Sequence, residues 1–171
     1  MKELILPRIA VDTREILRYT FPDHESYRMT LKTGDYSLEG FTDVLAVERK
    51  NHGDAWQMLT GERKRFERCL ERLSQLDRAA IVIESSMKEF CIPPSQIKRV
   101  NAATAMGSYI SWSTKWRIPV FFAENRQWGE RVTLRILAAY YKHCAGDALV
   151  RAQRLSDAGV TIMDDDVGTS R

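Results

Sequence analysis

The chain has 171 residues, with 26 Lys and Arg against 23 Asp and Glu and a formal net charge of +3. This length fits one domain with a single hydrophobic core. Hydrophobic residues make up 44% and charged residues 29% of the chain, which excludes the disordered and fibrous classes. The small net charge excludes a strongly basic architectural DNA-binding protein but leaves local basic faces open.

The sequence contains no apolar run long enough to cross a membrane, since the longest runs last only a few residues. The N-terminal segment MKELILPR has no small-residue cleavage site and does not resemble a signal peptide. The three cysteines lie far apart without a CxxC pair, which argues against a disulfide framework and a zinc module. We therefore expect no membrane partner and an intracellular location: a cytoplasm, a host cytoplasm, or the nucleus if the source is eukaryotic.

The first third of the chain predicts mostly strands. Residues 8–12 alternate apolar and polar side chains and end in an acid, which indicates a short strand that carries Asp12 to the edge of a sheet. Residues 15–20 suit a short helix closed by Pro22. Three β segments separated by glycine-containing turns predict a β-meander at residues 27–31, 34–38 and 43–50.

The rest of the chain predicts alternating helices and strands. Asp54 suits the N-cap of a helix through Leu59, and apolar residues then recur at helical spacing to Leu76. The apolar run at residues 79–84 is typical of a central strand buried on both faces. The pattern continues with a helix within residues 95–117, a strand at 118–123 and a helix at 127–144.

This order of elements predicts an α/β fold, with a mixed sheet between layers of helices. From Ala145 onward the chain contains Gly, Ser and a run of three aspartates, so we expect that region to fray. We therefore expect one domain at residues 1–145 and a partly flexible C-terminal tail at residues 146–171.

One stretch of the chain brings together the residue types most suited to chemistry. Side chains alternate between the faces of a strand, so Glu48 and Lys50 share one face and Arg49 points to the other. Asp35 comes from the preceding β segment, and Asp12 ends another strand. Three carboxylates at one end of a sheet would bind a hard cation such as Mg²⁺, beside which the lysine would orient an attacking water or stabilise charge on a phosphate.

The order Gly34-Asp35, then Glu48-Arg49-Lys50, then three residues and Asp54 resembles the signature of the XPF-type structure-specific endonucleases, a branch of the restriction-endonuclease-like nucleases. The segment VDTRE at residues 11–15, the basic helix after the motif and the strand AAIVIE extend the resemblance to about residue 142. The resemblance implies a restriction-endonuclease-like central mixed β-sheet flanked by helices.

The resemblance also implies a Mg²⁺- or Mn²⁺-dependent DNA endonuclease that hydrolyses phosphodiester bonds at branched, flap or junction DNA. Such an enzyme would act in recombination or repair, in a phage or bacterial setting. Asp12, Asp35 and Glu48 would bind the metal. The full catalytic set would be Asp12, Asp35, Glu48, Arg49, Lys50 and Asp54.

Each part of this motif also has an ordinary structural interpretation. Gly34-Asp35 is common turn chemistry, and Glu48-Arg49-Lys50 would suit a solvated strand edge. Arg49 is as well suited to a scaffold ion pair with Asp54 or Glu84 as to direct catalysis. The N-cap role of Asp54 is an equally good explanation of that residue.

Basic residues gather in two segments that would bind DNA phosphates in a salt-dependent manner. The first is the helix after the motif, and the second, between Phe90 and Ala123, contains no acid. In the first segment, neighbouring glutamates would instead neutralise the arginines through intrahelical pairs. The candidate DNA-binding residues are Arg14, Arg63, Lys64, Arg65, Arg68, Lys98, Arg99, Lys115 and Arg117.

Relatives of this type in eukaryotes and archaea generally carry a tandem helix-hairpin-helix domain after the nuclease domain. Only about 27 residues follow Cys144 here, too few for that module. A homodimer or a separate DNA-binding partner is therefore expected to help hold the DNA. The rival interpretation is a non-catalytic DNA-binding or scaffold module that acts with a nuclease or helicase partner.

Overall fold

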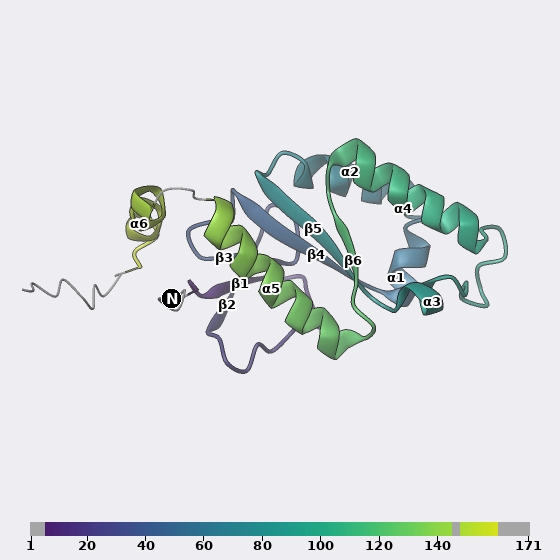
Figure 1. Cartoon of the computed structure of the whole chain (residues 1–171), viewed down its shortest axis with the longest axis horizontal. Coiled ribbons are helices and arrows are strands. Elements are labelled where there is room, and N and C mark those ends of the chain that lie inside the picture. The colour runs from purple at the N-terminus through teal and green to yellow at the C-terminus, as the bar shows by residue number, and fades with distance from the viewer. Residues whose placement is uncertain (1–5, 145–147, 161–171) are drawn as a thin grey trace, which may run out of the picture.

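A mixed six-stranded sheet forms the centre of the computed structural model, which describes residues 6–144 and 148–160 (Figure 1). The order across the sheet is β2-β1-β3-β4-β5-β6. The strands are β1 (Ile9–Asp12), β2 (Ser26–Met29), β3 (Tyr36–Leu38), β4 (Leu45–Asn51), β5 (Arg78–Glu84) and β6 (Val120–Phe122).

The pairing directions divide the sheet into two parts. Strand β3 is antiparallel to both β1 and β4, whereas β4, β5 and β6 run parallel to one another. Strand β5 therefore lies between two parallel neighbours, which confirms the buried central strand expected from its apolar run. The predicted meander is wrong, because β2 pairs in parallel with β1 at the edge of the sheet and not with β3.

Helices cover both faces of the sheet, as the restriction-endonuclease-like fold requires. In Figure 1, α5 lies across one face. Residues of α1, α2 and α4 pack in the core on the other face. The helices are α1 (His52–Gln57), α2 (Arg63–Leu73), α3 (Met87–Phe90), α4 (Ala102–Trp116), α5 (Arg126–Cys144) and α6 (Ala148–Asp157). No helix within residues 6–144 and 148–160 is both long and apolar enough to span a bilayer.

The alternation of side chains along β4 assigns each residue to one of two cores. Val47 packs in the core beneath α5, and Ala46 packs in the core beneath α2 and α4. Because successive side chains point to opposite faces, Glu48 and Lys50 follow Ala46 onto the α2 face. Arg49 follows Val47 onto the α5 face.

The segment between β1 and β2 contains turns in place of the short helix predicted at residues 15–20. Tyr19 and Phe21 are buried in the core beneath α5. Glu130 of α5 accepts hydrogen bonds from the backbone N–H groups of Thr20 (2.7 Å) and Phe21 (2.5 Å). Contacts to a distant helix therefore satisfy backbone groups that a local helix would have paired, which is why the helix prediction was wrong.

The region after Ala145, where we expected fraying, contains helix α6. Leu155 of α6 is 5% exposed in the core beneath α5. Arg154 forms an ion pair of 3.0 Å with Asp43, in the loop before β4. Leu155 and Arg154 thus attach the helix to the domain. Residues 161–171 of the expected tail lie outside the described residues.

Candidate active site

A cleft of about 300 Å³ lies on the α2 face of the sheet and contains four of the predicted catalytic side chains: Asp12, Asp35, Glu48 and Lys50. Asp12 is the last residue of β1, Asp35 directly precedes β3, and the other two lie in β4. The backbone N–H of Asp12 donates to the carbonyl of Asp35, and that of Asp35 donates to the carbonyl of Val47, each at 2.9 Å. The pairing of three strands therefore brings the three acids to one end of the sheet.

Gly34 explains how Asp35 reaches this place. Its φ of +79° lies in the left-handed region that favours glycine, and a Cβ atom there would be 2.7 Å from the Cβ of Ala46. Gly34 and Asp35 thus form a turn, as their ordinary structural interpretation predicts. The same turn places the carboxylate of Asp35 in the cleft.

Asp12 is buried and fully engaged by neighbouring donors. Oδ1 accepts from the backbone N–H (2.7 Å) and Nε (2.8 Å) of Arg14, and Oδ2 accepts from Nη2 of Arg14 and the N–H of Leu31, each at 2.8 Å. Burial raises the pKa of Asp12, but these hydrogen bonds outweigh it, and the pKa lies below its usual value. Asp12 is therefore an ionised carboxylate held by Arg14.

Asp35 and Glu48 form a carboxylate pair with one ammonium group. Asp35 Oδ2 accepts a hydrogen bond of 2.7 Å from the backbone N–H of Arg49, and Lys50 Nζ forms an ion pair with Glu48 Oε1. Burial and the charge of Glu48 raise the pKa of Asp35 well above its usual value. Burial lowers the pKa of Lys50, but the charges of Glu48 and Asp35 raise it by more. The pKa therefore lies above its usual value, and the amine stays charged. Two carboxylates beside one ammonium leave an excess of negative charge that favours a cation.

The donor set fits a hard divalent cation in its chemistry. Carboxylate oxygens are the ligands that Mg²⁺ and Mn²⁺ take in proteins. Burial, and then the charge of Glu48, raises the pKa of Asp35, so a cation beside it would stabilise its ionised form. Within residues 6–144 and 148–160, no three His, Cys, Asp or Glu side chains lie close enough together to hold a metal ion. Asp12 would have to give up part of its contact with Arg14 to become a third ligand.

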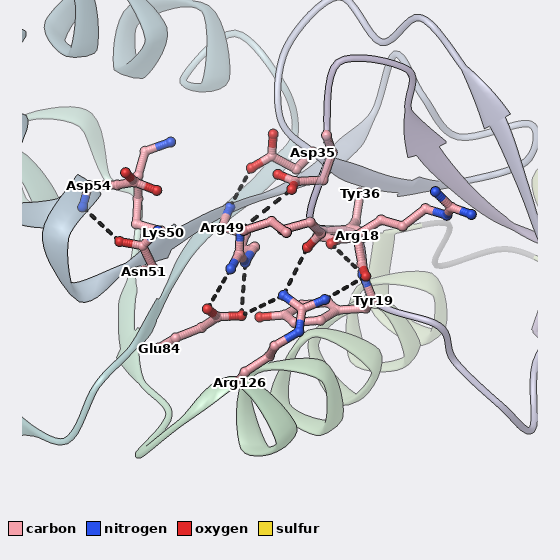
Figure 2. Close-up of polar contacts among 12 residues, drawn as sticks. Arg18, Tyr19, Asp35, Tyr36, Arg49, Lys50, Asn51, Asp54, Glu84 and Arg126 are labelled. Carbon is pink, nitrogen blue, oxygen red and sulfur yellow. Dashed lines mark hydrogen bonds and ion pairs between the residues drawn. The ribbon is translucent and has the colours of Figure 1, made fainter.

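Arg49 does not reach the cleft. On the α5 face, its Nε and Nη2 donate to the two oxygens of Glu84 at 2.8 and 2.6 Å (Figure 2). Its Nη1 lies 3.4 Å from Oε1 of Glu15. Burial lowers the pKa of Arg49, but Glu84 raises it above its usual value. Of the roles considered for Arg49, the scaffold pair with Glu84 is the one that forms, and the pair with Asp54 does not.

A second arginine, which the sequence did not single out, completes this network. Arg126, the first residue of α5, lies 3.6 Å from Glu84 and donates to the carbonyls of Leu17 (2.8 Å) and Arg18 (2.6 Å). Figure 2 shows Arg126 and Arg49 converging on the same carboxylate. The network joins α5, β4, β5 and the segment that follows Asp12, and no short motif could have revealed it because its members are far apart in the chain.

The N-cap of α1 is Asn51, so the prediction that Asp54 caps this helix is wrong. The helix begins at His52, two residues earlier than Asp54, and the Oδ1 atom of Asn51 accepts a hydrogen bond of 2.8 Å from the N–H of Asp54 (Figure 2). Asp54 does not line the cleft. Its proposed support of catalysis stays a prediction.

Basic side chains surround the acidic floor of the cleft. Arg14 and Arg65 were candidate DNA-binding residues, Arg72 belongs to the basic helix expected to bind phosphates but was not among those candidates, and Lys32 was not expected. Arg65 and Arg72 are seven residues apart on α2, so they lie on the same side of the helix. That spacing was the available signal for Arg72, whereas no periodic pattern marks Lys32 in its loop.

The other predicted contacts on α2 are all exposed, but they differ in their pairing. Arg63 lies 3.2 Å from Glu67 and stacks on Trp112 at 4.7 Å, and Arg65 pairs with Glu62 at 3.2 Å. The intrahelical pairs considered as an alternative are therefore present for these two arginines. Lys64 and Arg68 are exposed on the same helix.

The second basic segment is not gathered into one surface. Lys98 and Arg99 are exposed in the loop before α4, whereas Lys115 lies in its last turn and Arg117 is its C-cap. Helix α4 has 15 residues, and at 1.5 Å per residue it is roughly 22 Å long. The structure thus separates the two halves of this segment by the length of a helix.

The sequence matches the model of the ERCC4 domain over residues 11–132. The chain belongs to the ERCC4 domain family. The matched residues run from β1 into α5 and include every residue of the cleft floor. Comparison with the curated proteins gave no match to the sequence.

Two solved structures share the fold of this ERCC4 domain. One is XPF from Aeropyrum pernix in complex with DNA, with a TM-score of 0.63 and 20% identity, covering 80% of this chain and 66% of that chain. The other is XPF from Aeropyrum pernix, with a TM-score of 0.60 and 22% identity, covering 88% of this chain and 72% of that chain. The chain thus spans about two thirds of the length of the first structure. These matches identify the mixed sheet and its helices as the fold of the XPF nuclease domain.

Proposed function

We propose that this ERCC4 domain is a Mg²⁺- or Mn²⁺-dependent endonuclease that hydrolyses phosphodiester bonds in branched, flap or junction DNA. One observation carries the proposal: Asp35, Glu48 and Lys50 share a cleft with basic side chains. An acidic floor suits metal binding, and the basic surroundings suit the phosphates on either side of the scissile bond. The DNA complex of the A. pernix XPF supports the choice of substrate.

The residues of the cleft have different roles in the proposed hydrolysis. Asp35 and Glu48, joined by Asp12 once it gives up part of its contact with Arg14, would hold a divalent cation. The bound cation would supply an activated water and offset the negative charge of the scissile phosphate. Lys50, held in place by Glu48, would orient the attacking water or stabilise charge that develops on the phosphate. Arg49 acts from the opposite face of the sheet, where it anchors the strand whose backbone N–H holds Asp35.

The substrate is bound by the basic residues around the cleft. Arg14, Lys32, Arg65 and Arg72 line it together with the acids and would contact phosphates. A homodimer or a separate DNA-binding partner would extend the contact to the further arms of a junction.

A cleavage assay tests the enzyme directly. Purified protein is incubated with labelled flap, fork, junction and linear duplex DNA, in Mg²⁺, in Mn²⁺ and in EDTA. We expect metal-dependent cleavage of the branched substrates, with a loss of about 100-fold or more in Asp35→Asn and retained DNA binding. Asp77→Asn is the matched control, because Asp77 is exposed in the turn before β5.

Two results would contradict the proposal. DNA that stays intact with every metal and substrate, although the protein binds it, would favour the non-catalytic scaffold module. Calorimetric titration with Mn²⁺ tests the ligands separately, since Glu48→Gln should weaken binding. Equal Mn²⁺ affinity in wild type and Glu48→Gln would remove Glu48 from the ligand set.

A further inference from the structure

One flank of α5, on the face of the sheet opposite the cleft, carries an aromatic and basic stripe. Trp128, Arg131 and Arg135 are spaced by three and four residues, so they lie along one side of the helix. The indole of Trp128 is 48% exposed, and the guanidinium carbon of Arg131 lies 5.1 Å from its ring centroid. From Trp128 to Arg135 the stripe extends about 10 Å along the helix.

The stripe borders a hollow of about 520 Å³. Leu6, His24 and Ala138 line the hollow together with the stripe. The Nδ1 atom of His24 is buried and has no hydrogen-bond partner among the described residues. The hollow therefore combines apolar walls, two guanidinium groups and an unpaired imidazole nitrogen, a composition suited to a flat, polar, anionic ligand.

The two arginines of the stripe carry uncompensated charge. Neither Arg131 nor Arg135 forms an ion pair within residues 6–144 and 148–160, whereas Arg63 and Arg65 of α2 each pair with a glutamate on their own helix. The nearest acid in sequence, Glu130, accepts hydrogen bonds from the backbone of the β1–β2 segment. The stripe is therefore free to bind an external anion.

The stripe and the cleft are connected by one segment of the chain. Arg14 lines the cleft, and four residues later the carbonyl of Arg18 accepts a hydrogen bond from Arg126, at the first turn of α5. Trp128 follows two residues after Arg126. The segment that follows Arg14 is thus bonded to the end of α5 at which the stripe begins.

We propose that Trp128, Arg131 and Arg135 form a second nucleic-acid contact, which binds an unpaired strand of a branched DNA. Aromatic side chains stack on the bases of single strands, and arginines pair with the adjacent phosphates. Bases of an intact duplex are stacked on one another and cannot cover an indole ring. The stripe therefore distinguishes DNA with an unpaired arm from a linear duplex. Cleavage of the same DNA in the cleft rests on the proposed function. Binding of the unpaired strand by the α5 stripe does not.

Binding measured in EDTA tests the contact without any cleavage. Fluorescence anisotropy is recorded for a labelled single strand, a flap DNA with an unpaired arm and a blunt duplex. We expect Trp128→Ala to weaken binding of the single strand and the flap by about fivefold or more, with little change for the blunt duplex. Trp128→Phe should retain most of the affinity because it keeps an aromatic face.

The arginines are tested through salt dependence. In Arg131→Ala/Arg135→Ala, the slope of log affinity against log salt for the single strand should fall by about 1 to 2. Lys88→Ala, at an exposed position of α3, is the matched control and should leave the preference for single strands unchanged. Circular dichroism verifies that the variants are folded.

Three outcomes would overturn the proposal. The first is unchanged DNA affinity in both variants, and the second is an equal loss of affinity for blunt duplex and single strand. The third is a loss of self-association in Trp128→Ala with DNA affinity unchanged. That third result would assign this flank of α5 to contact with a second copy of the chain. Absence of cleavage by the wild type would refute the nuclease function alone, since the binding comparison uses no catalysis.

Discussion

The guanidinium of Arg49 forms a bidentate ion pair with Glu84, at 2.8 and 2.6 Å. This pair lies on the face of the sheet opposite the cleft that contains Glu48, the neighbour of Arg49 in sequence. Both side chains are 6% exposed. The backbone N–H of the same arginine donates to Asp35. Arg49 therefore acts on the cleft as a positioning residue: its side chain anchors β4 to β5, and its main chain holds a proposed metal ligand.

Removal of this guanidinium should destabilise the whole domain. Because Arg49→Met leaves Glu84 buried with less compensation, we expect the free energy of unfolding to fall by about 3–5 kcal/mol in urea denaturation. Arg78→Met, at the exposed start of β5, should change it by less than about 0.5 kcal/mol. Equal effects of the two substitutions would show that the pair does not anchor the sheet.

Asp35 should lower the stability of the metal-free protein near neutral pH. Because its pKa is raised in the folded state, ionisation as the pH rises above the ordinary carboxyl pKa costs folding free energy. Asp35→Asn keeps an oxygen for the N–H of Arg49 and removes the charge. In EDTA we therefore expect a higher melting temperature than the wild type at pH 7–8, with the difference disappearing toward about pH 4. If Asp35→Asn were less stable than the wild type at every pH, the excess of negative charge at Asp35 and Glu48 would be refuted. Asp77→Asn serves as the control.

Arg72 should contribute more to DNA binding than Arg63 does, although both lie on α2. Arg72 lines the cleft, whereas Arg63 is engaged by Glu67 and Trp112. We expect Arg72→Ala to reduce the salt dependence of flap-DNA binding by about one phosphate contact, with a smaller change in Arg63→Ala. Equal salt dependence of flap-DNA binding in the two variants would show that DNA contacts α2 as a general basic face. The position of Arg72 in the cleft would then add nothing to DNA binding.

Leu155 should stabilise the domain even though it lies in the region expected to fray. Its side chain is buried against the core beneath α5, so Leu155→Ala should lower the free energy of unfolding by about 2 kcal/mol. Val150 of the same helix is 49% exposed, and Val150→Ala should have little effect on thermal denaturation. Similar effects for both would mean that α6 adds nothing to the core.

Local patterns in the sequence were enough to predict most strands, the central position of β5 and the faces of β4. The alternation that separates Glu48 and Lys50 from Arg49 depends only on strand geometry, which each residue carries into any sheet. The Gly34 turn and the motif spacing placed Asp35 beside β4 for the same reason. The predicted acids and lysine therefore share one cleft.

The pairing of distant residues required the tertiary structure. Arg49 had two acids as candidate partners, and its pairing with Glu84 depends on β5 lying in parallel beside β4. The segment at residues 15–20 has helix-compatible composition, but its backbone is held by Arg126 and Glu130, more than a hundred residues away. The edge position of β2 likewise follows from its pairing with β1.

The sequence by itself determined the acid-lysine motif, the face that each of its residues occupies and the family to which the chain belongs, because these depend on residue type and short-range periodicity. Only the tertiary structure decided which basic residues share a surface with the acids. Arg72 lines the cleft and Arg117 lies at the far end of α4. Helix packing alone sets those positions, since interactions across many tens of residues leave no trace in local spacing.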